Sequence, residues 1–447
     1  MSKAKRAGEQ ELAVNGGPKA FAGTTGKPEP KIGVEEFMSV AERFGFTGEA
    51  LGRIRAAVSN DDFVGGGPNL ARYLCPFPEP PKGEQFEAAA REMFDVRCAL
   101  SISSGTAAVH AAAAAVGAAP GKEVIVPAIG FMATSAALAM TGATPVFCDV
   151  DESFQMDPGK IEPLITQRTV AVAPTHQWGG VCDMDPIVAV ARGHGLKVIE
   201  DCAQSPGGRY RGRYVGTIGD VGCFSISAYK IIGGGEGGLL VTDDEGLYDR
   251  ARQLAECGGL WRGDRFAPPR HAGELFVGTN YRMSELEAAV DVVQLAKLED
   301  VVGRHRKVFA RVAGRLATFR EIVPRRVTDA EGWIGYELRF YPETLELGRR
   351  IAAALTAEGI GCGYRGPDAA PDWHVYHHMF PVILDPATGE PRYRRGDCPV
   401  ADDLYDRSVR VGLDQWFAQA DCDAVAAGIN KVLSAYCTPD ERAAKWL

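Results

Sequence analysis

The chain of 447 residues lacks the sequence features of membrane and secreted proteins. Its longest weakly polar stretch, residues 107–119, is rich in alanine and well short of the roughly 20 residues that a membrane-spanning helix needs. The N-terminus, MSKAKRAGEQELAVNGG, has no apolar segment of the kind that forms the centre of a signal peptide. We therefore expect no membrane partner and a cytoplasmic location.

An excess of positive charge is also missing. The chain has 49 lysines and arginines against 58 aspartates and glutamates, which gives a formal net charge of -9. Proteins that follow a nucleic-acid backbone present basic surfaces instead. The charge balance therefore excludes nucleic acid as an expected partner.

Paired cysteine motifs are absent. The eleven cysteines include no C-x-x-C pair, so they fit neither a disulfide framework nor a zinc ribbon, and we expect reduced, mostly buried thiols. His374, His377 and His378 stand close together, but no acidic or cysteine partner lies at helical spacing to complete a zinc site. We expect loop histidines and no metal.

Glycine, by contrast, is abundant. The 53 glycines are about 12% of the chain, against an average near 7%. Glycine allows tight turns and close approaches of the backbone, so loops of that kind are expected. The first part of the chain, residues 1–85, is polar and rich in Gly and Pro, and we expect an N-terminal arm and a lid-like segment there, with a helix over 37–59.

Residues 86–317 show a regular alternation of short apolar runs and helical segments of about ten residues. The runs ALSIS, EVIVPA, TVAVAPT and LKVIEDC have apolar centres, most of them rich in β-branched residues. This pattern is typical of a mainly parallel sheet covered on both faces by helices. We also expect a short helix over 157–165 and a helix of about thirty residues over 284–316 that bridges two domains.

Residues 318–447 mix strand-like and helix-like segments. The run YELRFYP predicts a strand, and ELGRRIAAALTAEG and DCDAVAAGINKVLSAY predict helices. We therefore expect a smaller α+β domain at the C-terminal end of an α/β protein.

Three loops that leave predicted strands carry reactive residue types, and ligands of open α/β sheets bind at this end of the strands. The turn SSGT at 103–106 opens a helix, where it could hold a phosphate or only cap the helix. Asp201 ends the run LKVIED and could pair with a ligand cation or cap the next helix. Lys230 follows a buried apolar segment, so it is either a surface lysine or one with a lowered pKa that can form a Schiff base.

The glycine run at 233–238 matches G-x-G-x-x-G, but it precedes a strand and does not open a helix, which argues against a dinucleotide site. Taken together, the motifs resemble those of the DegT/DnrJ/StrS family of pyridoxal-phosphate-dependent sugar and cyclitol aminotransferases. They are S-G-T at 104–106, E-D-x-A-Q at 200–204, S-x₄-K-x₄-G-E-G-G at 225–238 and G-x-N-x-R-M at 278–283.

The resemblance covers about residues 86–300 and implies a fold type I enzyme, with an αβα large domain, a mainly parallel sheet and a smaller α+β domain. It also implies roles for single residues. Lys230 would form the Schiff base with pyridoxal 5'-phosphate and then move a proton as catalytic base. Asp201 would keep the ring nitrogen protonated. Phe131 would stack on the ring, unless it is a core residue, and Gln204 would touch the ring hydroxyl or a neighbouring group.

The resemblance places the cofactor phosphate at a helix start, held by Ser104, Gly105, Thr106 and Ser225. Asn280 resembles the asparagine that reaches the phosphate of the neighbouring subunit's cofactor. The resemblance therefore implies a homodimer with shared active sites.

The chain departs from the family pattern where a substrate would lie. Gly130 stands where threonine or tyrosine is usual, and His176-Gln177-Trp178-Gly179 replaces H-x-Y-G. His176, Trp178 and Arg282 are candidate substrate contacts, although Trp178 could equally be a core residue. Three further arginines in GGRYRGRYVG could bind a diphosphate, but their alternation is more typical of a solvated hairpin edge: Arg209, Arg211 and Arg213.

The sequence thus predicts an aminotransferase that moves an amino group from glutamate or glutamine to a keto sugar or keto cyclitol, in amino-sugar or aminoglycoside-like antibiotic biosynthesis. A pyridoxal-phosphate lyase or dehydratase on the same scaffold is an alternative. Family members that dehydrate sugars have histidine in the Schiff-base position, whereas this chain has Lys230. A non-catalytic regulator is a third alternative, and it predicts loss of the lysine or of the phosphate turn, both of which are present.

Overall fold

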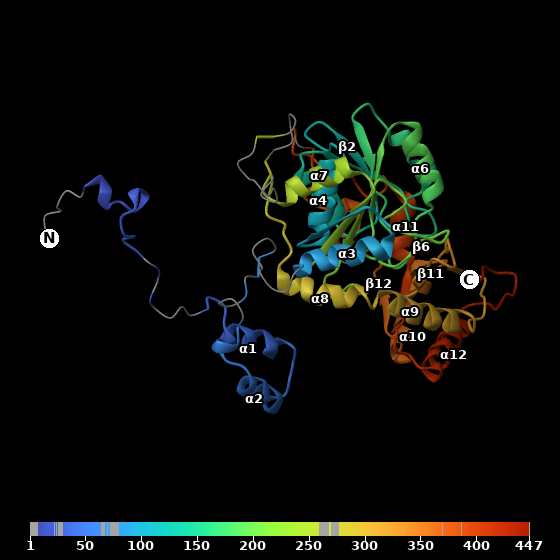
Figure 1. The fold of residues 1–447 in the computed structure, drawn as a ribbon. Coiled ribbons are helices and arrows are strands. Elements are labelled where there is room, and N and C mark those ends of the chain that lie inside the picture. The colour runs from blue at the N-terminus through green and yellow to red at the C-terminus, as the bar shows by residue number, and fades with distance from the viewer. Residues whose placement is uncertain are drawn as a thin grey trace. The chain divides into compact units, whose positions relative to one another are not determined.

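A computed structural model describes residues 8–21, 23, 25, 30–63, 68, 70–71, 80–258, 268–269, 277–368, 370–385 and 387–446. The chain divides into two compact units (Figure 1). The smaller unit comprises Met1–Asn69 and Leu74–Glu79, and the larger comprises Leu70–Tyr73 and Pro80–Leu447. The finer division of the larger unit at residue 317 stays a prediction.

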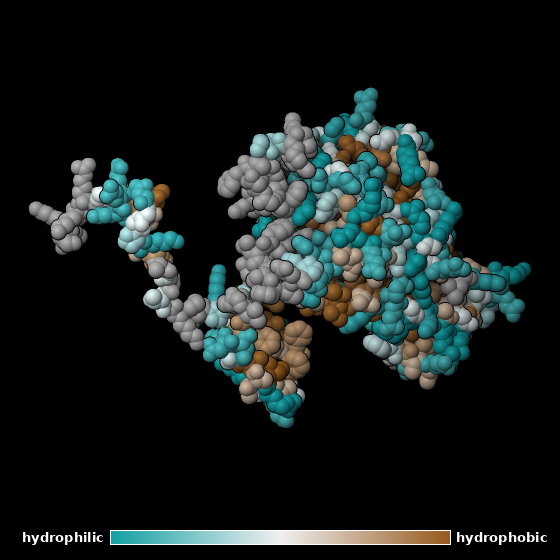
Figure 2. All heavy atoms as spheres, viewed as in Figure 1, coloured by the Kyte–Doolittle hydropathy of each residue, from teal (hydrophilic) through white to brown (hydrophobic). Residues whose placement is uncertain are grey.

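The smaller unit contains a pair of helices, α1 (Val34–Arg43) and α2 (Gly48–Ala57), where one helix was expected. The chain turns at Gly45, whose φ of 74° lies in the left-handed region, and Thr47 then caps α2 by accepting a hydrogen bond from the Ala50 amide (3.2 Å). Apolar residues also reach the surface of these helices (Figure 2). Where the structure describes this unit, it also contains short 3-10 turns at Glu9–Glu11, Ala13–Asn15 and Asn60–Asp62.

A seven-stranded sheet forms the centre of the larger unit, in the order β1-β9-β8-β5-β4-β2-β3. Only β9 runs antiparallel to its neighbours among these strands, so the expected mainly parallel sheet is confirmed. Every residue of β2, β8 and β9 is buried, which explains their continuous apolar sequences. The strands are β1 (Cys98–Ile102), β2 (Glu123–Pro127), β3 (Thr144–Cys148), β4 (Thr169–Val172), β5 (Lys197–Asp201), β8 (Val221–Ser225) and β9 (Gly238–Thr242).

Helices cover both faces of this sheet, each face with its own apolar core. The alanine-rich α4 packs against β8, β9, α5 and α7, and on the other face α3 packs along α8 (Figure 1). The helices are α3 (Lys82–Phe94), α4 (Gly105–Ala115), α5 (Ala133–Met140), α6 (Met184–Gly193), α7 (Glu245–Ala255), α8 (Glu285–Leu295) and α9 (Leu298–Ala313).

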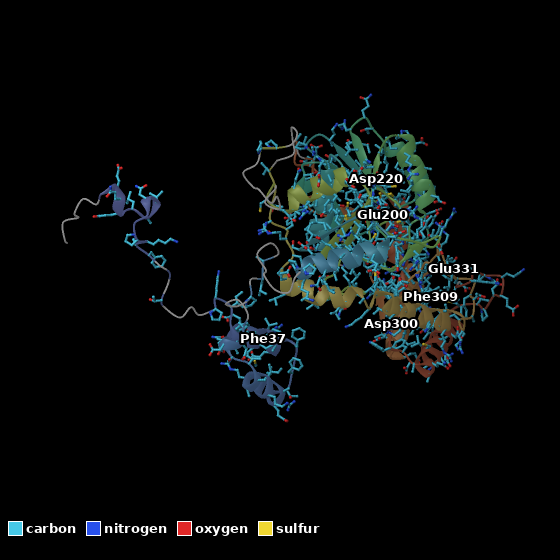
Figure 3. The ribbon with its side chains drawn as sticks, viewed as in Figure 1. Phe37, Glu200, Asp220, Asp300, Phe309 and Glu331 are labelled. Carbon is cyan, nitrogen blue, oxygen red and sulfur yellow. The ribbon has the colours of Figure 1, made fainter. Side chains whose placement is uncertain are left out.

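Two expected helices differ from the structure. Residues 157–165 form two 3-10 turns, Pro158–Lys160 and Glu162–Leu164, because the proline at 163 has no amide hydrogen to continue a helix. The expected long helix is divided into α8 and α9 at residues 296–297. The bridging role nevertheless belongs to α9: its first turns pack on the sheet, and its last turns, including Phe309, pack in the C-terminal core (Figure 3).

The C-terminal part has a four-stranded antiparallel sheet in the order β10-β11-β13-β12, with α9, α10 and α12 around a separate apolar core. Its elements are β10 (Ile322–Pro324), β11 (Glu337–Pro342), α10 (Leu345–Ala357), β12 (Cys362–Tyr364), α11 (Pro399–Arg407), β13 (Val409–Gly412) and α12 (Gln419–Tyr436), with a 3-10 turn at Tyr376–His378.

The arginine-rich segment forms a small hairpin of β6 (Arg209–Tyr210) and β7 (Arg213–Tyr214). The Arg209 guanidinium lies 3.9 Å from the centre of the Tyr214 ring and 3.2 Å from a Glu299 carboxylate oxygen. Arg211 forms an ion pair with Asp185. The expected hairpin is therefore present, with Arg209 and Arg211 in ion pairs at the surface and Arg213 donating to the Thr217 carbonyl. In the described ranges, no helix has both the length and the apolarity to cross a bilayer.

Candidate active site

A cradle of backbone amides forms where β1 passes into α4. Ser104 caps this helix, because its side-chain oxygen accepts a hydrogen bond from the Ala107 amide (3.1 Å). Gly105 and Thr106 begin the first turn, where the amides have no partner within a helix and attract anions. A Cβ atom on Gly105 would lie 2.6 Å from Cβ of Ser225, so β8 approaches the helix start as closely as glycine permits.

A cavity of about 160 Å³ lies at this helix start. It is lined by backbone and side-chain groups from β5, β8, α4, α5 and the loop after β8. The lining includes eight of the nine residues expected to hold a cofactor: Ser104, Gly105, Thr106, Phe131, Asp201, Gln204, Ser225 and Lys230.

Asp201 ends β5 at the wall of this cavity and is only 5% exposed. Its carboxylate accepts hydrogen bonds from the Thr134 hydroxyl (2.5 Å) and from the Ala203 amide (3.0 Å). Both donors are uncharged groups that orient the carboxylate, so it can still pair with a cationic ring nitrogen. Thr134 was not expected at the site, because nothing in the sequence distinguishes it from other helix residues.

Lys230 lines the same cavity, and burial lowers the pKa of its amine, while Asp201 and Glu236 act in the opposite direction. Among the described residues its side chain has no ion pair and no hydrogen bond. A lowered pKa increases the fraction of neutral amine, which is the form that attacks a carbonyl group.

These residues fit pyridoxal phosphate. The helix start and the Ser225 hydroxyl offer donors for a phosphate, Lys230 offers an amine for the aldehyde, and Asp201 offers an anion for the ring nitrogen. Phe131 is 48% exposed and lies on the cavity wall, so it is available to cover a ring and is not a core residue.

We expect Gly105→Ala to weaken cofactor binding about 5- to 150-fold, because the added methyl group must displace Ser225 or the helix start at an overpacking penalty of about 1–3 kcal/mol. Titration of the apoenzyme with pyridoxal phosphate measures this loss. Gly303→Ala is the matched control: a Cβ atom there meets nothing within 4 Å. Equal affinities for the Gly105→Ala and Gly303→Ala variants would contradict the phosphate position.

A larger cavity of about 1020 Å³ adjoins the first and shares Phe131, Gln204 and Lys230 with it. It extends to the C-terminal sheet and is lined there by Tyr336 and Arg410. A molecule in this cavity would thus reach Lys230 without contacting the helix start at Gly105 and Thr106.

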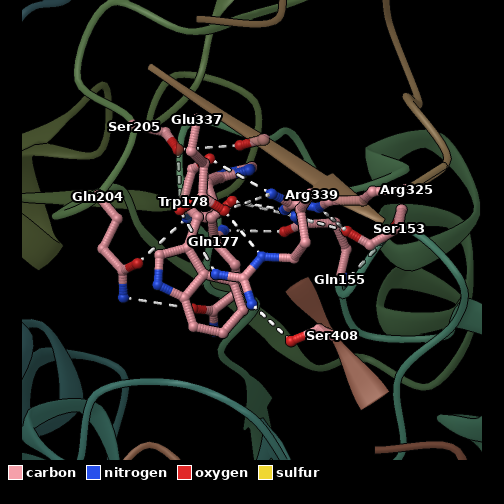
Figure 4. A network of polar contacts seen from close by, with 12 residues as sticks. Ser153, Gln155, Gln177, Trp178, Gln204, Ser205, Arg325, Glu337, Arg339 and Ser408 are labelled. Atoms are coloured by element: carbon pink, nitrogen blue, oxygen red, sulfur yellow. Dashed lines mark hydrogen bonds and ion pairs between the residues drawn. The ribbon is translucent and has the colours of Figure 1, made fainter. Parts of the chain in front are cut away.

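Trp178 lies between this larger cavity and the C-terminal sheet, and only 8% of it is exposed. Its backbone is in the left-handed region, with φ of 49°, which a tryptophan adopts only under constraint. Its amide donates to the Gln204 side chain (3.1 Å), and Arg325 donates to the carbonyls of Gln177 (2.8 Å) and Trp178 (3.3 Å) (Figure 4).

The Trp178 ring lies on Arg339, whose guanidinium carbon is 4.1 Å from the ring centre. Glu337 accepts a hydrogen bond from Arg339 (2.8 Å) and also lies 3.6 Å from Arg325, so one buried carboxylate faces two buried cations. Burial lowers the pKa of Arg325 to about 10. Sequence reasoning missed Arg325 and Arg339, because both stand in or beside C-terminal strands with no motif around them.

The expected substrate contact of His176 does not agree with the structure. His176 is fully buried, its Nε2 atom is 3.1 Å from Glu200, and its Nδ1 atom accepts a hydrogen bond from the Cys182 amide (3.1 Å). With Glu200 and Cys202 it forms a group close enough to hold a metal ion, but Glu200 already accepts hydrogen bonds from three backbone amides. His176 therefore holds the β4 and β5 ends together.

Asn280 and Arg282 lie outside the described cavities of their own chain. Their segment runs beside the end of β1, where the Ser103 amide donates to the Tyr281 carbonyl (2.8 Å). Asn280 is exposed, and the Arg282 guanidinium lies 3.7 Å from the Cys257 sulfur. The structure thus gives Arg282 no substrate contact within one chain.

Comparison with known proteins agrees with these observations. A model of the DegT/DnrJ/EryC1/StrS aminotransferase family matches residues 78–430. GDP-perosamine synthase of Caulobacter vibrioides is 33% identical over 350 residues, 78% of this chain and 89% of that protein. The UDP-N-acetyl-3-dehydro-alpha-D-glucosamine 3-aminotransferase of Acidithiobacillus ferrooxidans is 34% identical over 359 residues, with 79% and 89% covered.

Among solved structures, NtdA of Bacillus subtilis with bound pyridoxamine phosphate has a TM-score of 0.68 and 25% sequence identity, and the match covers 80% of this chain and 78% of that one. The larger unit thus has the fold of an enzyme that carries this cofactor.

Proposed function

Because the chain belongs to the DegT/DnrJ/EryC1/StrS aminotransferase family and is a pyridoxal-phosphate-dependent enzyme, we propose that it transfers an amino group from glutamate or glutamine to the keto group of a nucleotide-linked sugar. The two relatives are named for GDP- and UDP-linked products or substrates, which supports a nucleotide-linked acceptor over a free cyclitol. The observation that carries the proposal is the position of Lys230, which lines both the phosphate cavity and the larger cavity.

In this proposal the amides of Gly105 and Thr106 and the Ser225 hydroxyl hold the cofactor phosphate, and Phe131 covers the ring. Asp201 keeps a proton on the ring nitrogen. Pyridoxal phosphate, when bound, supplies a conjugated ring that takes up the electron pair left on the substrate carbon when its proton departs. The Lys230 amine would accept that proton on Nζ and deliver it to the carbon on the other side of the transferred nitrogen. Burial lowers the pKa of Lys230 and so increases the share of neutral amine, which is the form that accepts a proton.

The larger cavity is the proposed place of the sugar. Phe131, Trp178 and Tyr336 contribute aromatic surface to its wall, and Gln204 contributes an amide. Aromatic faces pack on the apolar faces of sugar rings, while amide groups bind their hydroxyls. The test is a panel of nucleotide-linked keto sugars and free keto cyclitols, each added to enzyme loaded with pyridoxamine phosphate. The return of the cofactor to its aldehyde form in the absorption spectrum reports amino transfer. A deoxygenated keto product without this return would contradict the proposal.

We further propose a homodimer in which Asn280 of one chain completes the phosphate site of the other. The exposed position of Asn280, outside the cavities of its own chain, supports this arrangement.

Shared sites predict complementation between two inactive variants. A mixed dimer of Lys230→Ala and Asn280→Ala chains has one site with both changes and one site with neither. Random reassociation should therefore restore about a quarter of the wild-type activity, because half of the dimers are mixed and each has one intact site. Activity after unfolding and refolding the mixture measures this, with each variant refolded alone as control. Activity no higher than the mean of the two variants would contradict shared sites.

A further inference from the structure

Arg410 of β13 is a cation without a counter-ion. Its side chain is exposed, and within the described parts of the chain it forms no ion pair and no side-chain hydrogen bond. Most other arginines of the C-terminal sheet and its loops are paired, as Arg365 is with Asp406 (2.9 Å). The charge of Arg410 is thus unbalanced at a defined place in the fold.

The place is unfavourable for a second cation. Arg410 stands directly opposite Arg339 in the antiparallel pairing of β11 with β13, so the two side chains leave the same face of the sheet. Like charges in directly opposite positions repel and destabilise a sheet. The nearby carboxylate, Glu337, is engaged by Arg339 at 2.8 Å and has Arg325 at 3.6 Å. Asp414 also lines the larger cavity but forms no ion pair with Arg410, so among the described residues Arg410 has no ion-pair partner.

The neighbouring strand β12 has a glycine opposite Arg410, which leaves space for the arginine side chain. This glycine is Gly363, and a Cβ atom there would come within 3.3 Å of the Arg410 Nε atom. The guanidinium stem therefore lies across the glycine, on the open side of the sheet.

Arg410 also lines two adjoining cavities. One is the cavity of about 1020 Å³ that contains Lys230, and the other, of about 300 Å³, is lined by arginine, tyrosine and serine side chains. The two share Trp178, His374 and Arg410. Asp372 is the carboxylate in the smaller cavity, and it is already bonded to His374 (2.7 Å) and to the Tyr405 hydroxyl (2.6 Å).

We infer that Arg410 binds an anionic group of a substrate, at the boundary between the sugar cavity and the smaller polar cavity. This inference rests on the proposed aminotransferase function. A guanidinium group forms paired hydrogen bonds with a carboxylate or a phosphate. Two substrates can supply such a group: the carboxylate of the amino donor and the phosphate of a nucleotide-linked acceptor. Binding of this anion would balance the positive charge of Arg410 opposite Arg339.

The two half-reactions separate these sources. The experiment compares four proteins, each loaded with cofactor: wild type, Arg410→Met, Arg410→Lys and the exposed control Arg442→Met. In the first half-reaction, absorption spectra follow the conversion of the aldehyde form of the cofactor by glutamate. In the second, they follow the conversion of the amino form by a nucleotide-linked keto sugar. We expect Arg410→Met to raise the half-saturating concentration about 10- to 100-fold in the step whose substrate supplies the anion. Arg410→Lys should fall between Arg410→Met and wild type. An effect on the glutamate step identifies a carboxylate, and an effect on the acceptor step identifies a phosphate.

Thermal unfolding without substrate gives an independent measurement. Because Arg410→Met removes the repulsion with Arg339, we expect its melting temperature to equal or exceed that of wild type. Succinate or inorganic phosphate should raise the melting temperature of wild type and of Arg442→Met, but not of Arg410→Met. Unchanged half-saturation in both steps, or a lower melting temperature of Arg410→Met without ligand, would overturn the inference. If wild type performs neither half-reaction, the proposed function fails, and the anion-dependent melting still decides the role of Arg410.

Discussion

Replacement of Lys230 by alanine is expected to lower turnover by at least about 10⁴-fold, because it removes both the amine that attaches the cofactor and the base that moves the proton. The visible absorption of the lysine-bound cofactor should disappear at the same time. The variant should keep its fold: burial opposes the charged form of Lys230, and no described partner loses a bond. Steady-state rates, absorption spectra and thermal unfolding measure the three effects.

Lys307→Ala is the matched control for this change. Lys307 is an exposed residue of α9, and its replacement should leave turnover and spectrum unchanged. Turnover in Lys230→Ala within tenfold of wild type would show that another residue carries the proton. The same result would also remove the basis for Lys230 as the attachment point.

The site residues found from sequence share one property: they lie in short loops with a local pattern. Gly105 opens a helix directly after a strand, Asp201 ends a strand, and Lys230 precedes a glycine run. Because such loops meet at one edge of a parallel sheet, their proximity follows from the strand order. The structure places all three around one cavity of about 160 Å³.

The site residues that sequence reasoning missed have their role through contacts with residues far away in the sequence. Arg325 and Arg339 support Trp178 from about 150 residues further along, and neither has a local pattern that distinguishes it from a surface arginine. His176 gave the opposite error: its motif stands where the resemblance places a substrate, but its side chain is buried and contacts the buried Glu200. Burial and pairing are properties of the packed structure, which a single sequence does not contain.

The helix boundaries show the same limit in the fold. Apolar spacing continues from α8 into α9, so periodicity alone predicts one helix. The break at residues 296–297 lets α8 pack along α3 while α9 reaches the C-terminal core. The sequence pattern likewise predicts one helix where the structure has α1 and α2. Two residues nevertheless mark the boundary: Gly45 is typical of a helix end, and Thr47 is typical of a helix start.

Asp201→Asn is expected to slow both half-reactions about 10²- to 10³-fold, since an amide of the same shape cannot hold a proton on the ring nitrogen as a carboxylate does. The rate constants should fall while the half-saturating concentrations of the substrates change little, because Asp201 faces the cofactor cavity and not the larger one. Single-turnover spectra separate these quantities. The exposed Asp185→Asn change is the control.

Thr134→Val tests the geometry behind this effect. It removes the hydroxyl that donates to Asp201 at 2.5 Å but leaves the negative charge, so the loss should be only about tenfold. A loss as large as that of Asp201→Asn would mean that orientation of the carboxylate, and not its charge, limits the proton transfer. Full rates in Asp201→Asn would contradict the pairing with the ring nitrogen, because the variant keeps the shape of the side chain and loses only its charge.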